Sequence, residues 1–483
     1  MGDDYDVIVL GGGPAGENAA DRASQGGLRV AVVEAELLGG ECSYWACMPS
    51  KTLLRPGAAL AAARRVPGVR EAVTGAIDVD KVLAWRNYMV SDWQDDGQVS
   101  WAGSAGIDLV RGWGRLAGER QVVVTPAPTP GGDGAGDPTG AQSGGGARTL
   151  TARRAVVVAT GSVPVNPPIP GLAESRPWGS REATSGKQVP RRLAVIGGGV
   201  VACEMAQAWR SLGSEEVTML IRGDHLLDRH EPFAGELLAD AFAGAGIDVR
   251  FGASPTAVGR DGADGPITLT LPGGGTIEVD EVLVATGRRP NTTGIGLDTV
   301  GVAEDKAIPV DDQLRVTGVG GGWLFAIGDV NGRSLLTHMG KYQGRLVGDL
   351  IAGRGDPSAT AFADHQATPG VVFTDPQIGS VGHTETSARK AGLDVGVADA
   401  ELGEVPGAYV SGEEVTGRGR LVIDRAGNVV VGATFVGPEI ADLVQGATIA
   451  IVGQVPLDRL WHAVPSFPSV SEIWLKLLQA YGL

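Results

Sequence analysis

Residues 5–16 read YDVIVLGGGPAG, an apolar run followed at once by a glycine-rich turn. The apolar run predicts a buried strand, and the Ala-rich stretch through Arg22 predicts a helix after the turn. Glycines at such a junction let the backbone approach a pyrophosphate at the helix N-terminus. A second strand, residues 30–33, ends in Glu34, a residue type that accepts hydrogen bonds from ribose hydroxyls. Together these features predict a dinucleotide-binding domain whose motif residues are Gly11, Gly13, Pro14, Ala15 and Gly16.

The same arrangement recurs in the middle of the chain. A strand at 193–196 is followed by GGGVVACE at 197–204, a helix and a second strand at 217–221. Gly197 and Gly199 take the positions that Gly11 and Gly13 have in the first motif. Arg222, however, stands where the first motif has an acid. An arginine there favours the 2′-phosphate of NADPH, and the alternative is a solvated surface cation. Arg229 and Arg288 are further candidates for contacting that phosphate.

Two of the three cysteines lie in residues 39–51, GGECSYWACMPSK. Residues five apart on a regular helix are separated by roughly 7.5 Å of rise, so a Cys42–Cys47 bridge requires an irregular turn. Pro49 supports such a turn, because it biases Met48 away from helical geometry. A helix that begins near Pro49 would favour a thiolate at Cys47. We interpret the pair as a redox disulfide; the alternative is two unpaired core cysteines.

The composition is that of a globular protein with several domains. The 483 residues predict roughly two to four domains, and the hydrophobic content of 43% is ample for their cores. The formal charge of −16 argues against non-specific binding to nucleic acid or anionic lipid, and no apolar stretch approaches the length of a membrane span. Three cysteines do not make a secreted disulfide scaffold, and the N-terminus shows no cleavage signal. We therefore expect a cytoplasmic protein that binds neither nucleic acid nor membrane.

The cysteine segment and the two glycine motifs, in this order, closely resemble the flavoprotein pyridine nucleotide-disulfide oxidoreductases. That family includes dihydrolipoyl dehydrogenase, glutathione reductase and mercuric reductase. The resemblance spans almost the whole chain, since further family landmarks occur at ATGS (159–162), ATGR (285–288) and LFAIGD (324–329). It implies an α/β fold with two Rossmann-like domains, for FAD and NAD(P), and a C-terminal α+β dimerisation domain.

The resemblance also implies domain boundaries. The expected segments are an FAD-binding domain in two parts (1–165 and 286–360), an NAD(P)-binding domain (166–285) and a dimerisation domain (361–483). The Pro- and Gly-rich residues at about 126–148 are interpreted as a disordered hairpin insertion in the FAD-binding domain.

Near the C-terminus we expect an antiparallel sheet followed by helices at 439–451 and 471–480. Trp85, Trp93 and Trp101 are spaced to line one side of a helix.

Roles for single residues follow from the resemblance. Cys47 would contact the flavin and Cys42 would attack the substrate, while Lys51 would lie near flavin N5 and pair with Glu204. FAD would also contact Glu41, Cys42, Thr160, Gly161, Gly328 and Asp329, the last through its ribityl chain. NAD(P) would contact Gly197, Gly199, Glu204, Arg222 and Gly287. The remaining cysteine, Cys203, is expected to be a small core residue.

The sequence departs from the family in its last segment. Members that reduce disulfides have a histidine that shuttles protons and a glutamate that orients it. Here the glutamate is Glu472, but Phe467 stands at the histidine position and carries no proton. His462 is a substitute if the loop path differs, and a structural loop histidine otherwise. An enzyme of the same family that cleaves and carboxylates a ketone thioether also has phenylalanine there.

Two further departures concern the cysteines. Tyr44 and Trp45 add bulk between Cys42 and Cys47. No cysteine follows Cys203, so the C-terminal metal-binding pair of mercuric reductase is missing, and no metal site is predicted.

These features lead to three hypotheses. The first is a homodimeric, FAD-dependent enzyme that passes hydride from NADPH, or less readily NADH, through the flavin to Cys42–Cys47 and on to a small disulfide-type electron acceptor. The second keeps this donor side but reduces a thioether, a quinone or another electrophile. The third is a redox-sensing flavoprotein whose disulfide is read by a partner.

Overall fold

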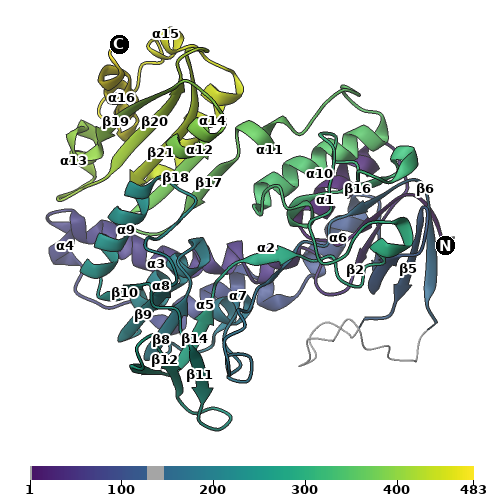
Figure 1. The fold of residues 1–483 in the computed structure, drawn as a ribbon, viewed down its shortest axis with the longest axis horizontal. Helices are drawn as coiled ribbons and strands as arrows, with labels where there is room; N and C mark the ends of the chain where they lie inside the picture. Colours follow the sequence, from purple (N-terminus) through teal and green to yellow (C-terminus); the bar gives the residue numbers. More distant parts are fainter. Residues whose placement is uncertain (1–2, 128–145) are drawn as a thin grey trace. The chain divides into compact units, whose positions relative to one another are not determined.

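The computed structural model describes residues 3–127 and 146–483, which form two compact units (Figure 1). Unit 1 comprises Met1–Met48, Asn87–Pro164 and Arg288–Asp364, and unit 2 comprises Pro49–Arg86, Val165–Gly287 and His365–Leu483. Both units combine helices with sheets, and the α/β fold predicted from the sequence is confirmed. The domain boundaries remain predictions, and residues 128–145 of the expected insertion lie outside the described part of the chain.

A seven-stranded sheet forms the centre of unit 1. Its order is β3 (Ile107–Arg111), β2 (Val30–Glu34), β1 (Asp4–Leu10), β6 (Arg148–Val158), β5 (Gln121–Thr125) and β4 (Trp113–Leu116), with β16 (Leu324–Ala326) also paired to β6. Strand β1 is buried on both faces, because Val7 and Val9 pack into one hydrophobic cluster and Ile8 and Leu10 into another. This explains its uninterrupted apolar sequence. Strands β5 and β6 pair as an antiparallel hairpin around the segment expected to be an insertion.

Helices α1 (Pro14–Gln25) and α10 (Thr337–Ala352) pack against each other on one face of this sheet (Figure 1). Glycines allow the close approach: a Cβ on Gly340 would lie 3.2 Å from the Cβ of Ala15, and one on Gly344 would overlap the carbonyl oxygen of Ala15. The other helical segments of unit 1 are α2 (Gly40–Tyr44), η1 (Ser91–Trp93), α6 (Asp96–Ser104), η2 (Leu297–Val300), η3 (Gly320–Gly322) and η4 (Gly328–Asn331). Strands β7 (Ser162–Pro164) and β15 (Arg288–Pro290) form a small antiparallel pair.

Unit 2 contains a second parallel sheet. Its order is β10 (Ile247–Phe251), β9 (Glu216–Ile221), β8 (Arg192–Ile196) and β14 (Glu281–Val284), beside an antiparallel sheet of β11 (Ala257–Arg260), β12 (Ile267–Thr270) and β13 (Thr276–Val279). Its helices are α4 (Val69–Ala72), α7 (Ser180–Ser185), α8 (Val200–Ser211) and α9 (Pro232–Gly244). Three more helices cross the limits of the units: α3 (Cys47–Arg65), α5 (Val79–Met89) and α11 (Phe362–Gln366).

The C-terminal part of unit 2 is the antiparallel sheet that the sequence predicts. Its order is β17 (Pro369–Val372), β18 (Gln377–Gly382), β21 (Val429–Gly437), β20 (Arg418–Asp424) and β19 (Val395–Glu401) (Figure 1). Its helical segments are α12 (Glu385–Lys390), η5 (Leu402–Glu404), α13 (Pro406–Ser411), η6 (Ile440–Asp442), α14 (Leu443–Val452), α15 (Leu457–Leu460), η7 (Val470–Glu472) and α16 (Ile473–Tyr481). Both predicted C-terminal helices are present, each with a short 3₁₀ turn at its start. Among the described residues, every helix is too short or too polar to cross a bilayer.

The prediction about the three tryptophans between residues 85 and 101 is wrong. Trp85, Trp93 and Trp101 do not share a helical side, because they belong to α5, η1 and α6. The break has a clear cause: Ser91, Asp92 and Trp93 all have positive φ, between 49° and 55°, which ends α5 and reverses the local turn. A regular spacing of tryptophans therefore does not indicate one continuous helix here.

Candidate functional site

The first glycine turn, between β1 and α1, is shaped for a close approach by a ligand. Gly11 has φ +100°, and a Cβ there would overlap the carbonyl oxygen of Ala159. Gly16 packs equally tightly, since a Cβ would overlap the carbonyl oxygen of Gly11. Gly13 caps α1 without a side-chain hydrogen bond, and a Cβ there would meet no atom within 4 Å. Pro14 and Ala15 open the helix, whose first turn has N–H groups without an intrahelical acceptor, as binding of a pyrophosphate requires.

Glu34 stands at the end of β2, beside the same turn. Its carboxylate accepts hydrogen bonds of 2.7 Å from the N–H of Gly12 and of 2.7 Å from the N–H of Glu36. Burial raises the pKa of Glu34, and the two backbone hydrogen bonds oppose that rise. The carboxylate is thus fixed against the glycine turn, where a ribose would lie.

Asp329 lies in η4, in the same unit. Ser162 donates a 2.5 Å hydrogen bond to its carboxylate, and Arg288 donates a 2.8 Å hydrogen bond to the Ser162 hydroxyl. Burial raises the pKa of Asp329. Arg288 also lies 3.8 Å from Glu41. Arg288 therefore belongs to this cluster, and its contact with a 2′-phosphate stays a prediction.

The other residues expected at FAD lie on the loops of this unit. Gly161 and Gly328 both have positive φ, at 74° and 72°. Thr160 donates a 2.7 Å hydrogen bond to the carbonyl oxygen of Asn291, and the N–H of Gly328 donates one to Gln343. An open helix N-terminus, a fixed carboxylate beside it and a half-buried aspartate are together what FAD requires. The residues of unit 1 therefore fit this cofactor.

The second glycine turn, in unit 2, repeats the backbone of the first. Gly197 has φ +130°, and a Cβ there would overlap the carbonyl oxygen of Ala285. Gly199 caps α8 without a side-chain hydrogen bond and with open space around it, and Gly287 has φ +130°. Arg222 is exposed directly after β9. These features fit a pyridine nucleotide.

Cys42 and Cys47 lie on different helices, as their spacing requires. Cys42 belongs to α2, which ends at Tyr44, and Cys47 is the first residue of α3. No disulfide joins these two described residues, and the Cys47 sulfur lies 3.3 Å from the Thr337 hydroxyl at the start of α10. The pKa of Cys42 is raised, first by its hydrogen bond with Cys47 and then by burial. The two sulfurs therefore share one environment, as a redox pair does.

The bulky residues between the cysteines pack inward. Tyr44 is 4% exposed and contacts Leu37 and Val90, and its hydroxyl donates a 3.0 Å hydrogen bond to the carbonyl oxygen of Leu38. Trp93, from the left-handed turn of η1, donates a 3.1 Å hydrogen bond to the carbonyl oxygen of Tyr44. Three consecutive left-handed residues cost of order 1–3 kcal/mol each, and such strain clusters at functional sites.

A pocket of about 190 Å³ opens between the cysteine segment and the strained turn. Its wall includes Ser43 and Met48 from the cysteine segment, and Ser91, Gln94 and Gln98 from the opposite side. The pocket is thus built from residues that flank both cysteines, within unit 1.

Lys51 and Glu204 form an ion pair within unit 2. Lys51 Nζ lies 2.7 Å from a carboxylate oxygen of Glu204, whose other oxygen accepts a 3.0 Å hydrogen bond from the N–H of Phe373. The ammonium also lies 5.2 Å from the centre of the Phe373 ring. Because Glu204 is only 2% exposed, the pair compensates a charge that would be costly alone.

The C-terminal residues do not form an acid–base pair within the chain. Phe467 is 76% exposed. Glu472 accepts a 3.3 Å hydrogen bond from the N–H of Ser469 and so caps its own short helix. His462 is exposed beyond α15, and no hydrogen bond or ion pair between described residues joins it to Glu472.

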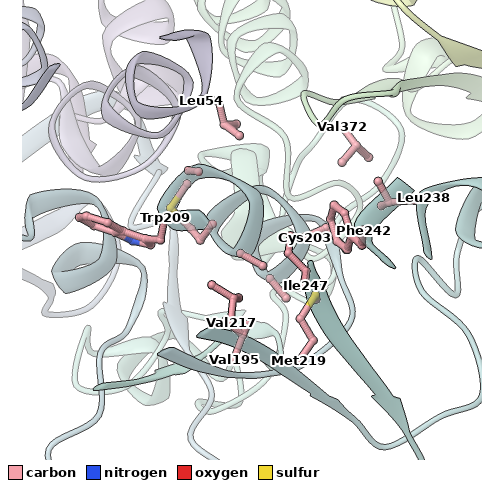
Figure 2. Close-up of a cluster of buried hydrophobic side chains, with 14 of the residues drawn as sticks. Leu54, Val195, Cys203, Trp209, Val217, Met219, Leu238, Phe242, Ile247 and Val372 are labelled. Atoms are coloured by element: carbon pink, nitrogen blue, oxygen red, sulfur yellow. The ribbon is translucent and has the colours of Figure 1, made fainter. Parts of the chain in front are cut away.

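Cys203 is a core residue, as expected. It is fully buried in a hydrophobic cluster of unit 2, and Figure 2 shows it with Val195, Phe242 and Ile247. Burial raises the pKa of its thiol. A neutral thiol there packs as a small apolar side chain.

Sequence reasoning missed three residues around the cysteine segment. Thr337 lies 3.3 Å from the Cys47 sulfur, the charge of Lys341 acts on Cys42, and the charge of Glu17 acts on Tyr44. Glu17 is half-buried on α1, and Thr337 and Lys341 lie one turn apart on α10. The only sequence signal is an acidic residue directly after the first glycine motif. Nothing local relates it to a helix three hundred residues later.

Two family models match the chain. The model for pyridine nucleotide-disulphide oxidoreductases matches residues 5–344, and the model for the dimerisation domain of the same family matches residues 368–478. The dimerisation domain supports a homodimer.

Known proteins agree with this assignment. A mercuric reductase of Staphylococcus aureus is 30% identical over 97% of this chain and 81% of its own length, and a dihydrolipoyl dehydrogenase of Chlamydia muridarum is 31% identical over 98% and 96%. A HOCl-induced flavoprotein disulfide reductase of Escherichia coli has the same fold, with a TM-score of 0.82, 23% identity and 99% coverage of both chains. The chain therefore belongs to the pyridine nucleotide-disulphide oxidoreductase family and is a flavoprotein enzyme that uses FAD and a pyridine nucleotide.

Proposed function

We propose that this enzyme uses NADPH to reduce the Cys42–Cys47 disulfide and that the resulting dithiol reduces a small electron acceptor. FAD, when bound, takes a hydride from the nicotinamide and passes two electrons to a disulfide. The observation that carries the proposal is the cysteine pair itself, because Cys47 opens α3, Cys42 hydrogen-bonds to it, and both lie beside a pocket. In this proposal Cys42 attacks the acceptor. Glu204 holds the Lys51 ammonium in a fixed position on α3.

The preference for NADPH rests on Arg222. Its exposed guanidinium directly follows β9, in the place that Glu34 takes after β2. A guanidinium matches a phosphate in charge and geometry, and a carboxylate matches a ribose diol.

The acceptor is proposed to be a small disulfide, and a second candidate is a non-disulfide electrophile such as a quinone or a thioether. The second is favoured by Phe467, since an exposed phenyl ring cannot supply the proton that a departing thiolate needs. For the same reason we expect slow turnover with lipoamide or glutathione disulfide. We propose a reducing compartment such as the cytoplasm, because the chain has only three cysteines.

Anaerobic titration tests the donor side. The purified holoenzyme is mixed with NADPH or NADH, flavin absorbance is followed, and thiols are counted with a chromogenic disulfide before and after. The expected result is two new thiols per chain and faster flavin bleaching with NADPH. The Cys47→Ser variant should still bleach but expose no new thiol pair. No increase in thiols in the wild type would contradict the proposal.

A panel of acceptors tests the other side. Glutathione disulfide, lipoamide and benzoquinone are each supplied with NADPH, and turnover is compared with that of the Cys42→Ser variant. Cysteine-dependent quinone reduction would favour the second candidate. Turnover of lipoamide at the rate of a dedicated reductase would contradict the role assigned to Phe467.

A further inference from the structure

Gln343 is a fully buried polar side chain of α10 to which the proposed reaction gives no part. Its Oε1 accepts a 2.7 Å hydrogen bond from the N–H of Gly328 and a 2.9 Å hydrogen bond from the side-chain amide of Asn331. Its Nε2 donates a 2.9 Å hydrogen bond to the carboxylate of Asp364. A buried amide is costly unless it is hydrogen-bonded, so these contacts hold the side chain in one place.

The carboxylate of Asp364 decides which way the amide of Gln343 points. A carboxylate accepts hydrogen bonds and donates none, so the Nε2 of Gln343 faces it and the Oε1 faces the opposite side. Asp364 is itself fully buried, and the guanidinium of Arg333 lies 3.4 Å from it, which compensates its charge. The oxygen of Gln343 is therefore aimed at η4, which begins at Gly328 and ends at Asn331.

The turn that Gln343 holds is the one that carries Asp329. Its first residue, Gly328, has φ +72° and lies against both α1 and α10, because a Cβ there would be 3.2 Å from the Cβ of Ala15 and 4.0 Å from the Cα of Gly340. Ala15 belongs to the first turn of α1, where the glycine motif leaves N–H groups for a pyrophosphate. One side chain of α10 thus fixes η4 beside that helix N-terminus.

We propose that Gln343 is a positioning residue for FAD binding and acts through Asp329. It holds both ends of η4, through Gly328 and Asn331, so that the Asp329 carboxylate is presented to the cofactor in one position. Without the amide, the N–H of Gly328 loses its acceptor in a buried place and the turn relaxes. The inference rests on the use of FAD and on the expected contact of FAD with Asp329. It requires neither NADPH nor the cysteine pair.

The test follows the release of FAD from the full-length holoenzyme. Each variant is diluted at about pH 8, at one temperature below the melting temperature of every variant, and the rise in FAD fluorescence gives the rate of release. Gln343→Met keeps a side chain of similar length without the amide. It should release FAD roughly ten- to a hundredfold faster than the wild type, because two buried donors lose their acceptor.

Exchange of donor and acceptor provides the rescue. Gln343→Glu alone brings two carboxyl groups together where an amide now meets a carboxylate, and it should also release FAD faster than the wild type. Gln343→Glu combined with Asp364→Asn restores that contact with donor and acceptor exchanged. Its rate should return to within roughly threefold of the wild type. These two variants keep a polar group of the same size at position 343, so they carry the test if Gln343→Met does not fold.

Asp349→Asn is the matched control for a general loosening of α10. Asp349 lies on the same helix and pairs with Arg22 of α1 at 2.6 Å. The variant should lower the melting temperature and leave the rate of FAD release unchanged. A merely structural role of Gln343 predicts instead that release follows the melting temperature in every variant, and that result would overturn the inference.

A double-mutant cycle with Asp329→Asn decides whether Gln343 acts through Asp329. Asp329→Asn should speed FAD release by itself, and Gln343→Met should add much less in that background than in the wild type. Additive effects, an unchanged rate in Asp329→Asn or Gln343→Met, or no rescue by the exchanged double variant would overturn the inference. Failure of NADPH to generate thiols would instead contradict the proposed function, and it does not bear on the rate of FAD release.

Discussion

The two glycine turns have the same backbone but different surroundings. In each, the first glycine faces the carbonyl oxygen of the residue that follows a neighbouring strand, Ala159 after β6 and Ala285 after β14. The third glycine of each turn caps a helix without a side-chain hydrogen bond. The strand that follows ends in a fixed carboxylate in the first turn, Glu34, and in an exposed guanidinium in the second, Arg222. The comparison teaches that one backbone arrangement serves both turns, while the charge of the side chain after the second strand differs between them.

The largest effect is expected from a methyl group at the first glycine of either turn. Gly11→Ala and Gly197→Ala each combine a strained φ with overlap against a backbone oxygen, which together cost about 2–5 kcal/mol. Gly11→Ala should lose FAD, and Gly197→Ala should keep FAD but lose reduction by NADPH. Bound flavin is measured by absorbance and reduction by stopped flow. Loss of flavin in both variants, or in neither, would contradict the assignment of FAD to the first turn and of the pyridine nucleotide to the second.

The next effect concerns Arg222. Arg222→Gln should lower the ratio of kcat/KM for NADPH to that for NADH by roughly ten- to a hundredfold, because one charge-assisted hydrogen bond contributes about 1.5–3 kcal/mol. Steady-state kinetics with both nucleotides measure this ratio. Arg191→Gln removes the same charge from an exposed position directly before β8, in the same unit, and serves as the control. An equal loss in both variants would mean general attraction by the charge of the unit, not recognition of the phosphate by Arg222.

A smaller effect is expected at the residue that follows each motif, which is Glu17 after the first and Cys203 after the second. Because the pKa of Glu17 is raised from 4.5 to about 7 in the folded chain, folding favours its neutral form. That stability is fully present below about pH 4.5 and is lost as pH rises through about 7. The melting temperature of the wild type, relative to Glu17→Gln, should therefore fall by about 2–4 °C between pH 5 and 8. Asp21→Asn should show no such trend.

The smallest effect is expected from Cys203→Ala. Removing one buried sulfur leaves a small cavity and should cost about 1 kcal/mol. Thermal denaturation measures that cost, and the rate of flavin reduction by NADPH should stay that of the wild type. A slower reduction would assign Cys203 a part in electron transfer that its fully buried position in the core gives no reason to expect.

Much of the fold was predictable because its signals are local. The strand, turn and helix around Gly11 and around Gly197 follow from apolar runs that end in glycines, and the helix break between Cys42 and Cys47 follows from their spacing and from Pro49. The helix predicted from the tryptophan spacing was wrong for a local reason as well. Residues 91–93 adopt left-handed backbone angles, and the segment contains no glycine or proline from which these could be predicted.

The candidate site was predictable only in part. Lys51 and Glu204 were expected to pair because of a family resemblance, and their ion pair is present. The inward packing of Tyr44 and the capping role of Glu472 were not predicted, since each depends on a neighbour that the sequence pattern does not identify.

The sequence by itself determined two dinucleotide turns, a reactive cysteine pair and the missing histidine at position 467, because spacing and residue type decide backbone geometry over a few residues. Only the tertiary structure decided which charges surround the cysteines. Lys341 follows Cys42 by about three hundred residues, yet its positive charge opposes the rise in the pKa of Cys42. Thr337, one turn before Lys341 on α10, lies 3.3 Å from the Cys47 sulfur. Electrostatic interactions depend on distance in space, and packing alone sets that distance.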